Sequence, residues 1–463
     1  PQGPPSQAGL VFSSERIAIM TRLFGTDGIR GIANDDLSPE LAFKLGEAAG
    51  HFLADKGRGR LVVGMDTRRS GDLLEASVVA GICSSGADAL RAGIVPTPAV
   101  AFLTRDLGAD GGVVISASHN PAAYNGLKLF DRDGFKLPDE IEDEIEEYLV
   151  SDRDWARPTS EGVGRAHAID DAVERYVAHA TSTVTGGLDG LRVALDCGHG
   201  AAARTSRAAF ESLGAIVTAV NCDWDGMDIN DRCGSTHLDV VADVVRSGAF
   251  DLGIAHDGDA DRVLAVDEAG REIDGDEIMA VCAVDLAGRG SLPGDTVVAT
   301  VMSNLGFDLA LRERGITVVK TRVGDRYVLD QMRSSGATFG GEQSGHVIFL
   351  DHTTTGDGLV TALQLASVVK RSGRTLSELA SVMKRFPQVL ENVRVADRGM
   401  LSASSAIAEA VHAAERELGE AGRVLVRASG TEPLVRVMVE AADEQQAREV
   451  VDRIAAVVRD ELG

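Results

Sequence analysis

Short apolar runs rich in β-branched residues alternate with longer amphipathic stretches through most of the chain. Such runs are typical of buried strands, and amphipathic stretches of a dozen residues or more are typical of helices. Strands that alternate with helices predict βαβ crossovers and largely parallel sheets. The predicted strands include LVVGMD (61–66), VVISAS (113–118), LRVALDC (191–197), DLGIAHD (251–257), TVVATV (296–301) and ITVVKT (316–321).

The pattern changes near the end of the chain. After Pro387 it predicts two helices and three strands: a strand over 388–396, a helix over 403–419, strands over 423–428 and 434–441, and a helix over 443–462. This order is typical of a small α+β domain rather than of a doubly wound sheet.

A chain of 463 residues exceeds what one hydrophobic core usually organises. We therefore expect an α/β protein of four domains around a central cleft: three related mixed or parallel α/β units and a smaller α+β unit. Residues 1–19 precede Met20 and have no signal-peptide pattern, so we expect a disordered extension there. The predicted domains are 20–168, 169–270, 271–385 and 386–463.

Four predicted strands end in a polar, Gly-rich loop. The loops are SASHNP (116–121), DGDADR (257–262), GEQSGH (341–346) and RASGTEP (427–433). In open α/β sheets, ligands bind beyond the carboxyl ends of strands. Because the loops are about one domain apart, we expect each domain to contribute one loop to the same cleft.

The net charge and the cysteine pattern limit the kinds of partner and the compartment that we expect for this chain. The net charge is −25, which disfavours general binding to nucleic acid or to an anionic membrane. The five cysteines have no C-x-x-C spacing, which indicates a reducing compartment. No apolar run reaches the roughly 20 residues of a membrane span. We therefore expect a cytoplasmic protein with a small-molecule partner.

The DGDADR loop is the strongest chemical signal. Asp257, Asp259 and Asp261 can turn three carboxylates toward one point, and oxygen ligands of this kind suit Mg²⁺ or Ca²⁺. An EF-hand also begins D-x-D-x-D, but it needs Gly where this chain has Arg262, and strand follows instead of helix. The sequence therefore favours a metal loop of another kind over a solvated acidic turn.

The other loops have weaker signals. In SASHNP, Ser118 is either a hydroxyl that carries a phosphoryl group or part of an ordinary turn closed by Pro121. In RASGTEP, hydroxyl groups, a glycine and an arginine are suited to a phosphate. GEQSGH offers Glu342, Ser344 and His346 to sugar hydroxyls. Arg68 and Arg69 follow a strand, and we interpret both as solvated surface residues.

Together and in this order, the motifs resemble the α-D-phosphohexomutase superfamily, over essentially the whole chain from Thr21. The resemblance implies that Ser118 is the phosphorylated serine, and that it and the three aspartates bind Mg²⁺. It implies that Arg30, His119, Lys128 and Arg262 act on the transferring phosphoryl group. It also implies a substrate-binding set: Asp325, Arg326, Glu342, Ser344, His346, Arg427, Ser429, Gly430, Thr431 and Arg436.

Within the superfamily, three features are similar to the members that act on glucosamine phosphate: GEQSGH with Gln343, RVGDRYV (322–328) and the opening RLFGTDGIRG. The implied reaction is an isomerase reaction with glucosamine 1,6-bisphosphate as intermediate, which supplies amino sugars to cell-wall precursors. The expected partner is a phosphosugar substrate, and the resemblance is compatible with a homodimer. The alternatives are a phosphomannomutase/phosphoglucomutase and a non-catalytic phosphosugar-binding protein. Ala260 replaces a glycine common in relatives, which we expect to be tolerated at a negative φ.

Overall fold

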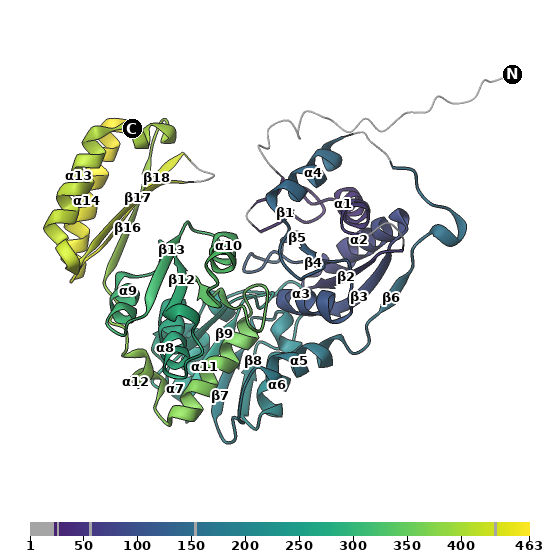
Figure 1. The fold of residues 1–463 in the computed structure, drawn as a ribbon, viewed down its shortest axis with the longest axis horizontal. Coiled ribbons are helices and arrows are strands. Elements are labelled where there is room, and N and C mark those ends of the chain that lie inside the picture. Colours follow the sequence, from purple (N-terminus) through teal and green to yellow (C-terminus); the bar gives the residue numbers. More distant parts are fainter. Residues whose placement is uncertain (1–22, 26, 55–57, 152–154, 430–432) are drawn as a thin grey trace.

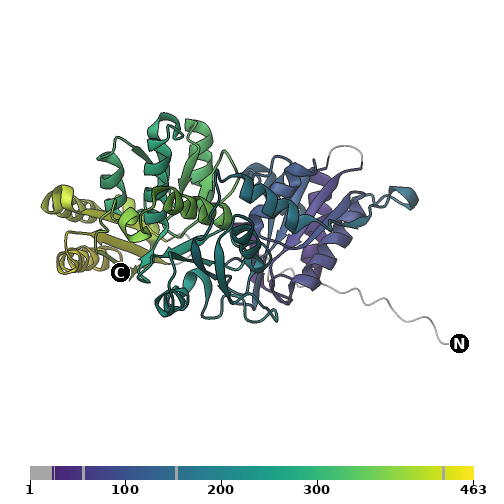
Figure 2. The same cartoon turned by 90° about the horizontal axis from the view of Figure 1, so that it is seen from below.

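The computed structural model describes residues 23–25, 27–54, 58–151, 155–429 and 433–463. The predicted extension 1–19 and the predicted phosphate ligands Gly430 and Thr431 lie outside these ranges. Figure 1 shows an arc of four units that runs from the purple amino-terminal unit to the yellow carboxy-terminal unit. Seen from below, the units follow one another in the order of the chain (Figure 2). The predicted four-unit α/β fold is confirmed.

The first unit has a mixed six-stranded sheet of order β1-β5-β4-β2-β3-β6. Ser38 caps its first helix by accepting a hydrogen bond from the N–H of Leu41, as the sequence predicts. The elements are β1 (Ile29–Ile32), α1 (Pro39–Phe52), β2 (Arg60–Met65), α2 (Gly71–Ser85), β3 (Asp88–Ile94), α3 (Thr97–Asp106), β4 (Gly111–Ile115), β5 (Tyr124–Asp131), α4 (Asp139–Val150) and β6 (Ala166–Ala168).

The second unit has a five-stranded sheet of order β11-β10-β9-β7-β8. Strands β7, β8 and β9 are parallel, while β10 returns antiparallel to β9 directly after the aspartate loop. The elements are α5 (Ala172–Ser182), β7 (Arg192–Asp196), α6 (Ser206–Ser212), β8 (Ile216–Val220), α7 (Asp239–Ser247), β9 (Leu252–His256), β10 (Val263–Val266) and β11 (Glu272–Ile273).

The third unit has a four-stranded sheet of order β13-β12-β14-β15, in which only β15 is antiparallel to its neighbour. The elements are α8 (Gly275–Gly288), β12 (Thr296–Thr300), α9 (Leu305–Arg312), β13 (Thr317–Thr321), α10 (Asp325–Ser335), β14 (Phe339–Gly341), β15 (Val347–Phe349), α11 (Gly358–Ser372) and α12 (Leu376–Ala380). Helix α11 is buried along almost its whole length, and it packs against α8 of its own unit and α5 of the second.

The last unit has an antiparallel sheet of order β16-β18-β17, covered by two helices. The elements are β16 (Gln388–Arg394), α13 (Ser405–Leu418), β17 (Arg423–Ala428), β18 (Leu434–Glu440) and α14 (Glu444–Leu462), close to the predicted bounds. Short 3₁₀ turns complete the described fold at 160–162, 201–204, 234–236, 293–295, 398–403 and 419–421.

The cores divide the molecule differently from the sheets. One core runs continuously from the sheet of the first unit through the second and third units, and it includes Val100, Phe210, Met279 and Leu363. The last unit has a core of its own, around Val437 and Ile454. Because burial of apolar surface holds units together, the first three units are joined by a shared core and the last unit is attached to them less tightly. Among the described residues, every helix is too short or too polar to span a bilayer.

Candidate functional site

The Ser118 loop leaves the central strand β4 of the first unit. Ser118 is fully buried, and its backbone has a φ of 51°, an uncommon left-handed conformation for a serine. Its Oγ donates a hydrogen bond to Oδ2 of Asp257 at 2.6 Å, and its N–H donates to Oγ of Ser116 at 2.9 Å. The predicted phosphoryl carrier and the predicted metal loop therefore meet, although 139 residues separate them.

Two side chains from different units hold the main chain of this loop. The guanidinium of Arg68 donates to the carbonyls of Ser118, Asn120, Pro121 and Tyr124 at 2.5–2.9 Å. The amide of Asn230 donates to the carbonyl of Ser118 at 2.9 Å. The prediction that Arg68 is a solvated surface residue is wrong, because the side chain is buried.

A buried ion pair with Asp66 compensates for the burial of the Arg68 guanidinium. Its Nε lies 2.9 Å from Oδ2 of Asp66, and both side chains are fully inaccessible to solvent. The strand β2 carries Asp66 at its carboxyl end and the chain then turns Arg68 inward, whereas Arg69 is exposed as predicted. A buried guanidinium with its hydrogen bonds satisfied fixes the geometry of the loop it contacts.

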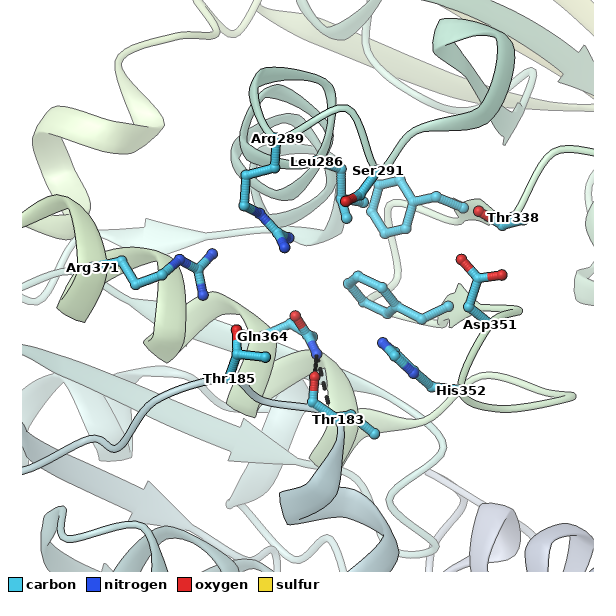
Figure 3. Close-up of a pocket in the computed structure, with 12 residues that line it drawn as sticks. Thr183, Thr185, Leu286, Arg289, Ser291, Thr338, Asp351, His352, Gln364 and Arg371 are labelled. Atoms are coloured by element: carbon cyan, nitrogen blue, oxygen red, sulfur yellow. Dashed lines mark hydrogen bonds between the residues drawn. The ribbon is translucent and has the colours of Figure 1, made fainter.

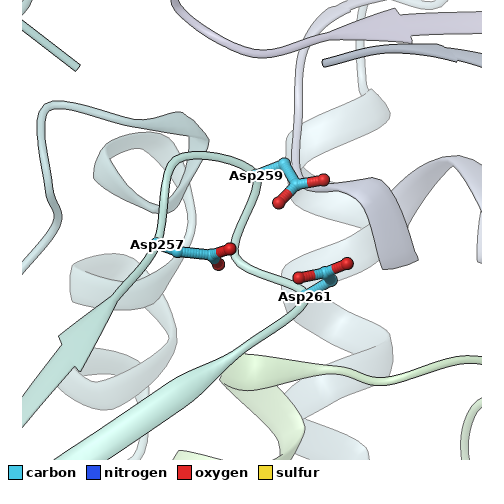
Figure 4. Close-up of side chains that lie close together, drawn as sticks. All are labelled: Asp257, Asp259 and Asp261. Atoms are coloured by element: carbon cyan, nitrogen blue, oxygen red, sulfur yellow. The ribbon is translucent and has the colours of Figure 1, made fainter. Parts of the chain in front are cut away.

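The three aspartates lie in the tight connection between β9 and β10. Asp257, Asp259 and Asp261 are all buried, and one carboxylate oxygen of each lies within 4.8 Å of the others. Figure 4 shows the three carboxylates turned toward a common space inside the loop. Ala260 has a φ of 52°, so the condition of a negative φ, under which we expect alanine to be tolerated, is not met. Its methyl group is fully buried in the shared core, which favours alanine there.

The carboxylates leave acceptor capacity for a cation. Oδ1 of Asp259 and Oδ1 of Asp261 are buried and accept no hydrogen bond from the described residues. Burial raises the pKa of Asp257 well above its usual range, and the negative charges of Asp261 and Asp259 raise it further. Lys128 and Arg262 balance part of the charge of the three carboxylates, and the remaining negative charge favours a further cation. The residues therefore fit a hard divalent ion such as Mg²⁺.

A chain of charges leads from the aspartates to the first unit. Lys128, on β5, is buried with Nζ 2.9 Å from Oδ2 of Asp259 and 2.9 Å from Oδ2 of Asp27. Asp27 also pairs with Lys136 at 2.5 Å and with Arg30. Burial tends to lower the pKa of Lys128, but the carboxylates outweigh it and raise that pKa well above its usual value.

Asp27 and Lys136 are residues that the sequence analysis missed. Asp27 lies in the quoted opening motif, but that motif gave no reason to prefer it over the arginine three residues later. Lys136 follows a turn and reads as an ordinary surface lysine. Only the packing of β1 against β5 brings their charges together.

His119 lies next to Ser118, and Arg262 lies next to His119. The Nη1 of Arg262 is 3.3 Å from Nδ1 of His119, and that nitrogen is 3.5 Å from Oγ of Ser118. Burial lowers the pKa of His119, and the positive charges of Arg262 and Arg30 lower it further. These groups place positive charge and hydrogen-bond donors near Ser118, which suits a phosphoryl group.

The sugar loop forms the turn between β14 and β15 in the third unit. His346 is buried, accepts a hydrogen bond at Nε2 from the N–H of Gly356 at 3.0 Å, and has Nδ1 3.7 Å from Oδ2 of Asp261. Glu342 accepts from the N–H of Gly324 at 3.1 Å, and Ser344 is exposed at the tip of the turn. The third loop is therefore in contact with the second.

Two further predicted ligands begin helix α10. Asp325 pairs with Lys136 and lies 3.5 Å from Nε2 of His346, so it joins the site. Arg326 instead pairs with Asp139 and, at 2.8 Å, with Glu142 on α4 of the first unit. The structure thus places Arg326 between the first and third units rather than beside the sugar loop.

The phosphate loop belongs to the last unit. Arg427 on β17 faces Arg436 on β18 across the sheet, and burial together with Arg436 lowers the pKa of Arg427. Ser429 is buried, and its carbonyl accepts from Arg398 at 2.6 Å. Adjacent guanidinium groups are favourable beside an anion.

A hollow of about 250 Å³ lies elsewhere, between α8, α11 and the segment after α5. Figure 3 shows Arg289 and Arg371 on one side of it and His352 and Gln364 on another. Both arginines contact Asp285, at 2.7 and 2.8 Å, so their charge is partly balanced. None of the predicted catalytic, substrate-binding or metal-binding residues lines this hollow.

Four family models match the chain in the order of its units. They are described as phosphoglucomutase/phosphomannomutase alpha/beta/alpha domain I (residues 21–154), domain II (174–270), domain III (274–386) and the C-terminal domain (390–457).

Curated relatives match over nearly their whole length. A phosphoglucosamine mutase of Streptomyces griseus subsp. griseus is 58% identical over 453 residues, which cover 96% of this chain and 100% of that protein. A phosphoglucosamine mutase of Pelotomaculum thermopropionicum is 54% identical over 442 residues, which cover 95% and 99%.

Solved structures share the fold at lower identity. A phosphoglucomutase/phosphomannomutase family protein from Burkholderia thailandensis matches with a TM-score of 0.78 and 24% identity, over 95% of this chain and 97% of that one. The N-acetylphosphoglucosamine mutase of Aspergillus fumigatus, in complex with GlcNAc-6P and magnesium, matches with a TM-score of 0.67 and 20% identity, over 95% of each chain.

Proposed function

The chain belongs to the phosphoglucomutase/phosphomannomutase family, and from this premise we propose that it interconverts glucosamine 6-phosphate and glucosamine 1-phosphate. The observation that carries the proposal is the 2.6 Å hydrogen bond between Ser118 and Asp257. It joins a buried hydroxyl to three carboxylates that fit a divalent cation. The choice of glucosamine is supported by full-length relatives named phosphoglucosamine mutase.

The proposed reaction uses Ser118 as a phosphate carrier. The phosphoryl group leaves Oγ of phospho-Ser118 and bonds to the O1 atom of glucosamine 6-phosphate. The O1 hydroxyl gives its proton to a neighbouring base, and Oγ takes up a proton as its bond to phosphorus breaks. The product is glucosamine 1,6-bisphosphate, which turns around in the site. Its 6-phosphoryl group then moves to Oγ of Ser118, which gives up its proton, and the O6 atom takes up a proton. The net result is a 1-phosphate and a reloaded serine.

Charge neutralisation is the main requirement of phosphoryl transfer. A bound Mg²⁺ held by Asp257, Asp259, Asp261 and a phosphoserine oxygen would supply most of it. Arg262 and Arg30 lie close enough to His119, the neighbour of Ser118, to lower its pKa, and they would bind the remaining phosphoryl oxygens. His119, whose pKa is lowered, is the candidate to take up a proton, whereas the raised pKa of Lys128 favours a protonated side chain that acts as a donor.

The other loops bind the part of the substrate that does not react. Glu342 and Ser344 on the sugar loop would take sugar hydroxyls, with His346 and Asp325 behind them. Arg427, Arg436 and Ser429 would bind the second phosphate, with Gly430 and Thr431. Arg326 would contribute to substrate binding indirectly, by helping to position its neighbour Asp325. The last unit must approach the other three loops for both phosphates to be held together.

The carrier role is tested with Ser118→Ala. We expect the purified unsubstituted protein to retain a phosphate, seen as about 80 Da of added mass, and to catalyse the reaction. The variant should lose both and keep its thermal midpoint. Ser77→Ala, which removes an exposed helix hydroxyl, is the matched control. Turnover by Ser118→Ala near that of the control would refute the role.

The sugar is tested by kcat/KM for the 6-phosphates of glucosamine, glucose and mannose. We expect glucosamine 6-phosphate to be preferred, and a preference for glucose or mannose would instead identify a phosphoglucomutase or phosphomannomutase. A chain that binds these sugars without turnover would be a phosphosugar-binding protein. The cytoplasmic location and the allowance for a homodimer stay predictions.

A further inference from the structure

Two cysteine thiols from neighbouring strands meet in the second unit. Cys197 follows β7, Cys222 follows β8, and their Sγ atoms lie 3.4 Å apart. The N–H of Cys197 donates to the carbonyl of Val220 at 3.2 Å, so the two segments are fixed side by side. Cys197 is fully buried, whereas Cys222 is partly exposed.

The two thiols differ in their chemistry. The hydrogen bond with Cys197 lowers the pKa of Cys222, and the positive charge of Arg207 acts in the same direction. The same hydrogen bond and burial raise the pKa of Cys197. A partly exposed thiol with a stabilised thiolate next to a buried second thiol is the arrangement of a reactive and a resolving cysteine.

We propose that Cys197 and Cys222 form a reversible oxidation site, at which a hydroperoxide closes a disulfide and slows the mutase reaction. The Cys222 thiolate attacks the peroxide oxygen and becomes a sulfenic acid, while the leaving oxygen takes a proton. The Cys197 thiol then displaces water from that sulfenic acid and the S–S bond forms. With hydrogen peroxide, two thiols and one peroxide give one disulfide and two water molecules. A dithiol reductant reverses the reaction.

The thiol pair is connected to the proposed active site through hydrogen bonds. Gly198, next to Cys197, accepts at its carbonyl from the N–H of Asn230 at 3.0 Å, and the Asn230 amide holds the carbonyl of Ser118 at 2.9 Å. On the same segment, the N–H of Ala201 donates to the carbonyl of Gly258 in the aspartate loop at 2.9 Å.

Closing the disulfide brings the Sγ atoms from 3.4 Å to about 2.05 Å, and we assign part of this movement to the 197–201 segment. Both loops of the site depend on that segment. A displacement of about 1 Å at a reacting centre is enough to lower a rate by up to about a hundredfold. The activity part of this inference rests on the proposed function, whereas disulfide formation does not.

The test treats the full-length protein with hydrogen peroxide, quenches it with an alkylating reagent, and maps the peptides without reduction. We expect a linked Cys197–Cys222 peptide, two hydrogens lighter than the sum of its parts, and a fall in kcat of about tenfold or more that dithiothreitol restores. Cys222→Ser should keep its kcat under peroxide. Cys83→Ser, which removes a partly buried cysteine elsewhere, is the matched control and should be inhibited like the unsubstituted protein.

Two results would overturn the proposal. One is alkylation of both Cys197 and Cys222 after peroxide treatment, with other cysteines oxidised instead. The other is a disulfide at this pair with unchanged kcat, because the connection to Ser118 would then have no effect. If the unsubstituted protein has no mutase activity, peptide mapping still decides whether the pair is oxidised.

Discussion

The guanidinium of Arg68 donates a hydrogen bond to the main-chain carbonyl of Ser118 at 2.9 Å. Three more carbonyls of the same loop accept from Arg68, so this side chain fixes the loop that carries the serine. Lysine would retain the ion pair with Asp66 but cannot reproduce the planar set of donors. We therefore expect Arg68→Lys to fold and to lower kcat by about tenfold to a hundredfold.

The control for this variant is the adjacent residue. Arg69 is exposed, and its hydrogen bond to the carbonyl of Gly226 comes from its main-chain N–H, so Arg69→Lys should retain normal kcat. Steady-state kinetics of both variants measure kcat, and circular dichroism checks that both variants fold. Equal kcat in the two would mean that Arg68 does not position Ser118.

The aspartate loop predicts a stability order that reverses with metal. In metal-free protein, Asp261→Asn removes one of the charges that repel Asp257, so the variant should melt at or above the unsubstituted protein. Mg²⁺ at about one hundred times its Kd should stabilise the unsubstituted protein by about 2.7 kcal/mol and the variant much less. Differential scanning calorimetry with EDTA and with Mg²⁺ measures both.

Asp231→Asn, at an exposed aspartate of the same unit, is the control for the metal experiment. It should respond to Mg²⁺ like the unsubstituted protein. A thermal midpoint that Mg²⁺ raises equally in Asp261→Asn would place the ion elsewhere.

Glu440 anchors the last unit to the third. Its carboxylate is fully buried, accepts from the N–H of Leu305 at the start of α9 at 2.8 Å, and pairs with Arg423 at 3.0 Å. Glu440→Gln removes the charge from these contacts. We expect a KM for the phosphosugar about tenfold higher, because the unit that carries Arg427 is then less well positioned.

Two measurements separate positioning from general damage in Glu440→Gln. Hydrogen exchange should become faster in the first turn of α9 while α14 keeps its protection. Glu391→Gln breaks an exposed pair with Arg459 on the same unit and should leave KM unchanged. A fall in kcat alone, at constant KM, would contradict the anchoring role.

Asp276 predicts a dependence of stability on pH. Burial, with the nearby charge of Asp274, raises its pKa in the folded protein to about 7, against about 3.9 in an unfolded chain. Between these values the folded protein binds one more proton. The stabilising contribution is therefore complete below about pH 4 and is lost as the pH rises through about 7.

Asp276→Asn should flatten this dependence, since an amide does not titrate. We expect the thermal midpoint to fall less between about pH 5 and about pH 8 in the variant than in the unsubstituted protein. Asp239→Asn, in the exposed first turn of α7, should retain the original slope. Identical slopes for all three proteins would show that Asp276 does not titrate in this range.

The sequence by itself determined the local elements and the four loops. Helix α1 begins where Ser38 and Pro39 predict it, and the strands of the last unit lie within a few residues of the predicted bounds. Helix caps, turn residues and hydrophobic periodicity depend on residues that are close together in the sequence, so they can be recognised from the sequence alone. The three aspartates at alternate positions could be assigned to a metal for the same reason.

Only the tertiary structure decided which distant groups meet. Arg68, Lys136 and Asn230 each read as ordinary polar residues, and their roles arise because strands far apart in the sequence end at the same place. Burial then changes their energetics, since a charge away from water must find a partner. The 3.4 Å contact of Cys197 and Cys222 has the same origin, in the parallel pairing of β7 and β8. No local pattern encodes such distances, because they depend on how whole sheets pack.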